Sequence, residues 1–141
     1  VVKAPPVISI ACVWPEENAP KEQIQQVMEA ITGYIDIHRI FATAQDIVDM
    51  KQGRVRRVPE RPPRSDRLHY LRGFIVYYGR HYTAYFYSRR MRTWILCDDA
   101  KVTVVGAWRE VVRRCVMGHS QPTLLFYEEQ EDQGQEQGQG Q

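Results

Sequence analysis

The chain has 141 residues, of which 43% are hydrophobic and 26% are charged, and this composition excludes a chain that is disordered throughout. The net charge is only +2, and no apolar run approaches the roughly 18 residues of a membrane span, so no membrane contact is expected. Three cysteines without framework spacing argue against a disulfide scaffold or a complete zinc site, and they favour a reducing compartment, the cytoplasm or the nucleus.

The first predicted elements are a strand and a helix. Residues 7–14 (VISIACVW) form a short apolar run between prolines, which is typical of a buried strand. Residues 18–20 (NAP) open a helix that extends to about Thr32, because apolar residues recur there at helical spacing, and Gly33 is expected to end it. Partial alternation in residues 34–41 predicts another strand.

The middle of the chain contains a basic stretch and then a run of strands. Residues 51–67 hold several Gly or Pro breaks and little apolar material, which predicts a basic loop insertion. Residues 51–72 carry eight basic and two acidic side chains and are the most polarised part of the chain. Consecutive strands are predicted in residues 68–78, 81–88, 92–97 and 102–105.

The last predicted elements are a helix, a strand and a tail. Residues 108–117 (WREVVRRCVM) place four apolar side chains on one stripe, so a helix is predicted, and Gly118 ends it. Residues 122–127 (PTLLFY) predict a last strand, and residues 129–141, rich in Gln, Gly and Glu, predict a disordered tail. This order of elements is typical of an α+β fold, an antiparallel sheet with flanking helices.

The predicted hairpin brings a histidine and a carboxylate together. With a tight turn at residues 89–90, His81 lies directly opposite Asp98, and opposed residues share one face with Cβ atoms about 4.5–5.5 Å apart. A hydrogen bond between them would fix the tautomer of the imidazole and raise its basicity. A turn one residue longer or shorter would bring Asp99 or Cys97 opposite the histidine instead. The alternative interpretation is a purely structural His–Asp pair at the end of a sheet.

An ordered set of motifs resembles the His box and closing strand of the ubiquitin-specific protease family. The set is HYTAY (residues 81–85), Trp94, Asp98-Asp99 and LLFY (residues 124–127), in the family's order and at about its spacing. VISIACVWPEE and CVMGHSQPTLLFYE are similar to a divergent branch that includes weakly active or inactive members. The resemblance implies that residues 1–128 are the C-terminal, palm half of a papain-like cysteine hydrolase domain that cuts after the C-terminal Gly of ubiquitin.

The resemblance also implies catalytic roles for individual residues. His81 matches the family's general base, and Asp98 matches the residue that orients it. Asp99 would hydrogen-bond the backbone nearby. This mechanism needs no metal and no cofactor, and the family's zinc-binding CxxC pairs are absent from the sequence.

Substrate contacts follow from the same resemblance. Tyr78 and Gly79 lie where the family's loop approaches the ubiquitin tail, and Tyr82 and Tyr85 match positions that pack around the catalytic strand. The family usually has Gly directly before the histidine, whereas this chain has Arg80 there and Gly one place earlier.

None of the three cysteines suits the nucleophile that such a base would activate. Cys97 neighbours Asp98 in a strand and therefore points to the opposite face. Cys115 lies near the C-terminal end of a helix, the wrong dipole end for a thiolate, and Cys12 lies in an apolar strand. Each is interpreted as a small buried hydrophobe. The chain begins with Val and without a signal segment, so we expect residues upstream, and we predict that the chain alone is inactive.

Three functions are compatible with the sequence. The first is a deubiquitinase-like thiol hydrolase domain, with ubiquitin or a ubiquitin-like protein as partner and the missing half of the domain in the same or another chain. The second is a catalytically inactive structural or ubiquitin-binding module in a larger complex, which Arg80 and the missing nucleophile favour. The third, ranked last, is a nucleic-acid-associated protein that acts through residues 51–72.

Overall fold

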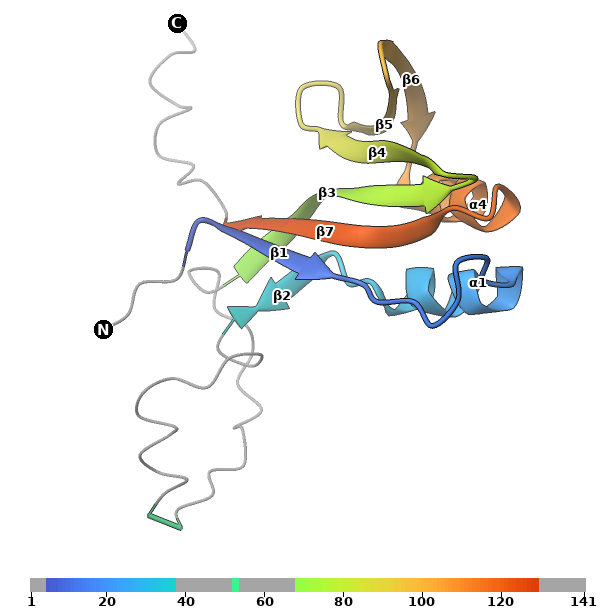
Figure 1. The fold of residues 1–141 in the computed structure, drawn as a ribbon. Coiled ribbons are helices and arrows are strands. Elements are labelled where there is room, and N and C mark those ends of the chain that lie inside the picture. Colours follow the sequence, from blue (N-terminus) through green and yellow to red (C-terminus); the bar gives the residue numbers. More distant parts are fainter. Residues whose placement is uncertain (1–4, 38–51, 54–67, 130–141) are drawn as a thin grey trace, which may run out of the picture.

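The computed structural model describes residues 5–37, 52–53 and 68–129, which form one antiparallel sheet and two helices (Figure 1). The strands run in the order β1-β7-β3-β4-β5-β6, and β2 pairs with the first residues of β3. The bounds are β1 Val7–Ala11, α1 Lys21–Ala30, β2 Tyr34–Asp36, β3 Leu68–Tyr78, β4 His81–Ser88, β5 Thr93–Asp98, β6 Lys101–Gly106, α4 Trp108–Met117 and β7 Gln121–Glu129. The predicted α+β fold with an antiparallel sheet is confirmed.

All the predicted helices and strands are present, and β3, β4 and α4 match the expected bounds residue for residue. The first strand, β1, ends at Ala11 instead of Trp14, so Cys12 follows the strand rather than lying in it. The end of α1 differs, because Ile31 is already extended, with φ −70° and ψ 117°, so the helix stops before Gly33. The predicted basic insertion, apart from residues 52–53, lies outside the described residues. The same holds for residues 38–41 of the predicted second strand and for residues 130–141 of the predicted tail.

The core lies on the face of the sheet that carries both helices. Phe74 is at its centre, fully buried, with its ring stacked on Tyr85 at 5.2 Å and edge-on to Trp108 at 5.7 Å. A bulge at Arg72 shifts the register between β3 and β7, so that Leu71 and Phe74 both face the core. Apolar side chains of α1 and α4 complete the core: Ile24, Met28, Val111 and Cys115.

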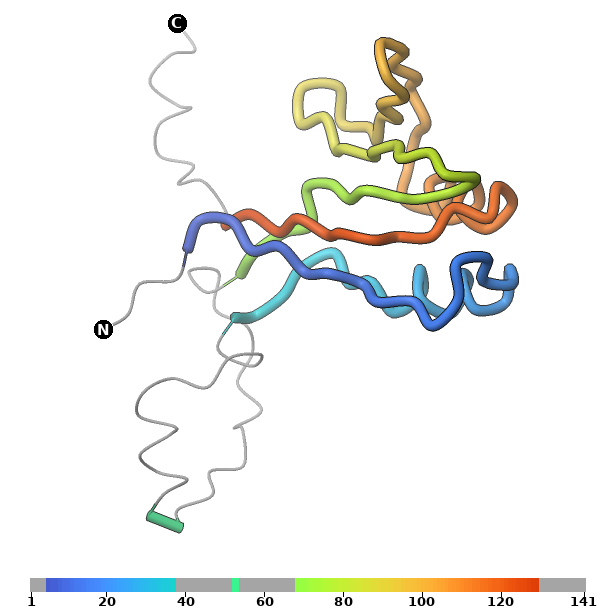
Figure 2. The backbone as a smooth tube through the Cα atoms, in the orientation of Figure 1, coloured from blue at the N-terminus to red at the C-terminus, as the bar shows by residue number. Residues whose placement is uncertain are grey.

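Three connections lie at the same end of the sheet. The tube in Figure 2 shows the β1–α1 loop, the β3–β4 turn and the α4–β7 turn close to one another, beside the ends of both helices. Residues far apart in the sequence therefore meet at this end. Neither of the described helices is long and apolar enough to cross a membrane.

Candidate active site

The side chains of His81 and Asp98 meet at the end of the sheet. His81 is the first residue of β4, and Asp98 is the last residue of β5. The His81 Nε2 atom lies 2.7 Å from Oδ1 of Asp98, and about half of each side chain is exposed. The predicted contact between these two residues is therefore confirmed.

The register of the hairpin, in contrast, was predicted wrongly. Four residues, 89–92, form the turn instead of two, so Ser88 opposes Thr93 rather than Met91. The Ser88 hydroxyl accepts a hydrogen bond from the backbone N–H of Met91 at 3.2 Å, and Arg92 adopts a φ of 52°, which together make the wider turn. The shift is two residues, and residues two apart on a strand share a face. Asp98 therefore stays on the side of His81 and reaches it diagonally.

The hydrogen bond to Asp98 is the main reason why the pKa of His81 is raised above its usual value. Desolvation opposes this effect, and the negative charges of Asp98 and Asp99 add to it. Because Nε2 is engaged, Nδ1 is the remaining nitrogen of the ring, and it makes no hydrogen bond with a residue in the described ranges. The neutral imidazole can accept a proton there.

The turn between β3 and β4 places Tyr78 beside the histidine. Gly79 and Arg80 both have positive φ, 58° and 65°, as a two-residue hairpin loop of this kind requires. The left-handed conformation of Arg80 costs roughly 1–2 kcal/mol that a glycine would avoid. Tyr78 pairs with His81 across this turn, so their side chains share a face.

Asp99 lies in the exposed turn between β5 and β6, with a φ of 50°. Its carboxylate forms no hydrogen bond with any residue that the structure describes, which corrects the expected bond to nearby backbone. Three possible metal ligands lie within 4.8 Å of one another, one atom each from His81, Asp98 and Asp99. These three residues could hold a divalent cation.

The two tyrosines that follow the histidine lie in different surroundings. Tyr85 is 3% exposed and stacks on Phe74 in the core. Tyr82 is 61% exposed and points to the face of the sheet opposite His81, where its ring packs 4.9 Å from that of Tyr77. The structure thus brings Tyr78 and Gly79 to the histidine but leaves Tyr82 on the other side.

The cysteines occupy sites that do not activate a thiol. Cys97 pairs with Ala84 and therefore faces away from the His–Asp pair. Cys115 is fully buried, and burial raises the pKa of its thiol to about 12. Burial also raises the pKa of Cys12, which is half-buried. None of the three is a thiolate poised beside His81.

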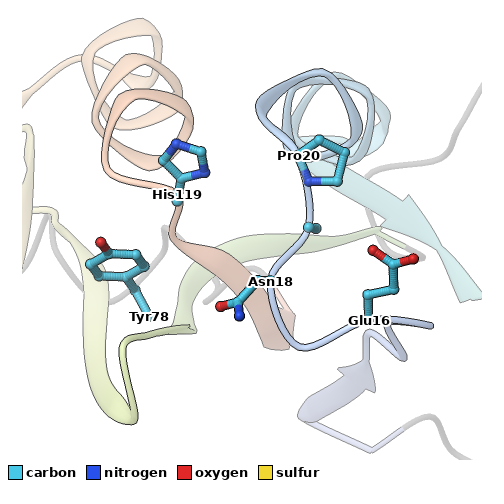
Figure 3. A pocket seen from close by; sticks show the side chains of 6 residues that line it. Glu16, Asn18, Pro20, Tyr78 and His119 are labelled. Carbon is cyan, nitrogen blue, oxygen red and sulfur yellow. The ribbon is translucent and has the colours of Figure 1, made fainter.

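A cavity beside the pair was not foreseen from the sequence. Its volume is about 530 Å³, and its lining comes from the β1–α1 loop, the end of β3 and the α4–β7 turn (Figure 3). The lining residues are Glu16, Asn18, Ala19, Pro20, Tyr78 and His119. The one local signal was the polar, proline-bounded segment PEENAP, of which residues 18–20 were interpreted only as the start of a helix.

The fold is thus an antiparallel sheet with two helices, and a hydrogen-bonded His–Asp pair lies at the end of the sheet. No profile of a known protein family matches the chain. Over 128 residues, it is 31% identical to ubiquitin carboxyl-terminal hydrolase 54 of Mus musculus, 30% identical to that of Rattus norvegicus and 28% identical to ubiquitin carboxyl-terminal hydrolase 53 of Homo sapiens.

The matched segment covers 90% of this chain but only 7% of each hydrolase 54 and 10% of hydrolase 53. The resemblance to the ubiquitin-specific protease family is confirmed, because these relatives are divergent members of it. The chain is thus similar to a short segment of much longer proteins.

Proposed function

We propose that this chain supplies the general base and its orienting carboxylate to a deubiquitinase-like thiol hydrolase domain, as a papain-like palm half. The observation that carries the proposal is the 2.7 Å contact between Nε2 of His81 and Oδ1 of Asp98, which leaves Nδ1 for a thiol. The names of the relatives, ubiquitin carboxyl-terminal hydrolases, support ubiquitin conjugates as the substrate.

In this mechanism, Nδ1 of His81 takes the proton of a cysteine thiol while the sulfur attacks the carbonyl carbon of the isopeptide bond. The imidazolium returns that proton to the lysine amine as the C–N bond breaks and a thioester remains. A water molecule, deprotonated by Nδ1, then attacks the thioester and releases the carboxylate and the thiol. Asp98 holds the ring and stabilises the imidazolium in both steps, and it stays ionised.

The thiol would come from another segment, of the same or of another polypeptide, because none of this chain's three cysteines is placed to be activated. The partner would be ubiquitin or a ubiquitin-like protein, in the cytoplasm or the nucleus.

A catalytically inactive, ubiquitin-binding module is the second candidate. Arg80 favours this candidate, because it adopts a φ of 65° directly before His81, at a position where the family usually has glycine. A role in nucleic-acid binding ranks last, because the basic stretch of residues 51–72 has no aromatic residue before Tyr70 on which a base could stack.

A segment exchange tests the proposal. The matched segment of the mouse relative is replaced by this chain, and hydrolysis of a ubiquitin–fluorophore amide is measured beside the unaltered relative. We expect turnover that His81→Ala lowers about a hundredfold or more, as loss of a general base does. Arg113→Ala, on the exposed side of α4, is the control and leaves turnover unchanged.

Unchanged turnover in the His81→Ala exchange protein would overturn the proposal. An exchange protein that binds ubiquitin and does not cleave it, while the unaltered relative does, would favour the inactive module. Ubiquitin binding is followed separately by chemical-shift changes in labelled ubiquitin, so the two outcomes are distinguished.

A further inference from the structure

The strand β6 is the last strand in the order of the sheet, and one of its sides forms an edge (Figure 1). The turn between β5 and β6 has two residues, so Asp98 and Lys101, which flank the turn, form a hydrogen-bonded pair. Hydrogen-bonded and non-hydrogen-bonded pairs alternate along an antiparallel ladder. Val102 and Val104 therefore direct their backbone N–H and C=O groups away from β5, toward the edge.

The fold leaves these outward backbone groups unused. Val102 and Val104 form no backbone hydrogen bond toward the edge with any residue that the structure describes. Their side chains are 61% and 60% exposed and lie on the face of the sheet opposite the core, because Thr103 between them pairs with Leu96, which packs against the core. An edge strand with apolar, exposed side chains is a template for pairing with another strand.

The two edges of the sheet differ in how they are protected. The edge strand β1 directly follows Pro5 and Pro6, and proline is a common device that blocks pairing at an edge. The stretch from Lys101 to Val104 contains no proline, and its one charge lies at its end. The edge of β6 is therefore the less protected of the two.

The strand β6 is complementary to itself in an antiparallel pair. A two-fold axis at Thr103 places Val102 opposite Val104 of a second copy, and Val104 opposite Val102. Each of these pairs exchanges two hydrogen bonds, because both valines direct their backbone groups to the edge. An axis at Val102 would instead bring in Ala100 of the turn, and an axis at Val104 would bring in Gly106, whose φ of 120° leaves the strand.

The ends of the paired strands are complementary in charge. The axis at Thr103 places Lys101 opposite Val105 of the second copy, and opposed residues share a face, here the face that carries the helices. On that face Glu110 extends along the strand, since its Cγ lies 3.8 Å from the position of a Cβ atom at Gly106. Lys101 of each copy thus comes close to Glu110 of the other.

We propose that β6 is a dimerisation edge, at which a second copy of this chain pairs antiparallel about Thr103 and continues the sheet. Such an edge buries a small area, so we expect a weak dimer with a dissociation constant on the order of 100 µM. The inference stands apart from the proposed function, because neither His81 nor Asp98 takes part in the contact between the copies.

Sedimentation equilibrium and NMR test the dimer. We expect a monomer–dimer equilibrium in a concentration series from about 10 µM to about 1 mM, with concentration-dependent amide shifts centred on residues 101–106. In a mixture of isotope-labelled and unlabelled chains, nuclear Overhauser effects should connect the Val102 methyl groups of one copy with those of Val104 of the other. Cβ atoms of opposed residues lie about 4.5–5.5 Å apart, which is within the range of this effect.

Two substitutions of Val104 should weaken the dimer at least about tenfold each. Val104→Lys replaces an apolar pair by a charged one. Val104→Pro removes an outward N–H and keeps the ladder to β5, because that N–H points to the edge. Val7→Lys is the matched control, since Val7 is a half-exposed valine on the other edge strand, and it should change the dissociation constant less than about twofold. NMR spectra of the variants at low concentration show whether they fold.

A charge exchange tests the register. Lys101→Glu should weaken the dimer about fivefold, and the addition of Glu110→Lys should restore it, because two exposed ion pairs reverse together. No dimer at about 1 mM would overturn the proposal. Shifts centred outside β6, equal weakening by Val7→Lys and Val104→Lys, or failure of the charge exchange to restore the dimer would overturn it as well.

Discussion

The chemistry of His81 depends on one hydrogen bond at an exposed position. The side chains of His81 and Asp98 are each about half exposed, so solvent can reach both of them. The 2.7 Å contact orients the imidazole ring without shielding it from solvent. The sequence predicted this contact because both residue types lie at strand ends in one hairpin. It could not establish a catalytic role, since the same contact serves a structural pair equally well.

Substitution of Asp98 should change the ionisation of the histidine. We expect Asp98→Asn to lower the pKa of His81, because the carboxylate hydrogen bond is the largest cause of its raised value. Asp99→Asn should lower it less, since Asp99 acts only through its charge. Proton NMR titration of the imidazole measures both changes, and an unchanged pKa in Asp98→Asn would contradict the geometry.

The same pair should make stability depend on pH in a defined direction. The folded pKa of His81 lies above the unfolded value of about 6.5, so the stabilisation is complete below that value. It is lost as the pH rises through the raised folded pKa. Asp98→Asn should therefore flatten the profile of unfolding free energy over this range. Urea unfolding at several pH values in this range measures the profile, and Arg113→Ala is the control. If the free energy of unfolding changed equally with pH in the unaltered chain and in Asp98→Asn, the pair would not cause the pH dependence.

The three thiols should differ in reactivity. Cys115 is fully buried, and burial raises the pKa of its thiol to about 12, so its thiolate is rare at pH 8. We expect iodoacetamide to alkylate Cys115 far more slowly than the half-buried Cys97, as peptide mass spectrometry can follow. In guanidinium chloride all three should react alike. Equal rates for Cys115 and Cys97 in the folded chain would show that the core opens.

At the scale of elements, patterns with strong periodicity were predictable and turn geometry was not. The alternating run of β4 and the apolar stripe of α4 define those elements without reference to the rest of the chain. The β4–β5 turn contains three arginines and no glycine, so its composition predicts neither a turn of four residues nor the positive φ of Arg92. The error in register follows from that turn.

The pairing of β3 and β4 contains a close contact that a substitution can test. A Cβ atom at Gly73 would overlap Cδ1 of Phe86 and lie 2.8 Å from the Tyr85 carbonyl oxygen. We expect Gly73→Ala to lower the free energy of unfolding by about 1–3 kcal/mol, as overpacking does. In a Phe86→Ala background the cost should fall by at least about 0.5 kcal/mol, which urea unfolding of the four proteins measures. If the effects of Gly73→Ala and Phe86→Ala on the free energy of unfolding were additive, the Phe86 ring would simply move aside to make room for the new Cβ atom.

At the scale of the whole molecule, the site end of the sheet combines residues about a hundred positions apart. Glu16 and His119 line one cavity only because β1 and β7 are neighbours and α1 packs beside α4. No local pattern links these segments, so sequence reasoning found the histidine and missed the cavity beside it. Tertiary arrangement, rather than propensity, determines what surrounds the base.

The chain alone should not cut a ubiquitin conjugate. We expect no hydrolysis of a ubiquitin–fluorophore amide by this chain alone, because a His–Asp pair without an activated thiol lacks a nucleophile. The unaltered mouse relative is the positive control in the same fluorescence assay. Turnover that disappears on substitution of Cys12, Cys97 or Cys115 by Ala would show that the burial of that thiol does not prevent its activation.

The four-residue turn at residues 89–92 also bears on how this hairpin tolerates insertions and deletions. Because strand side chains alternate, a change of two residues in the turn keeps Asp98 on the side of His81, whereas a change of one rotates Asp98 to the other face and brings its neighbour Asp99 to the side of the histidine. Two consecutive aspartates therefore leave a carboxylate on the side of His81 after an odd as well as an even change in the length of this turn.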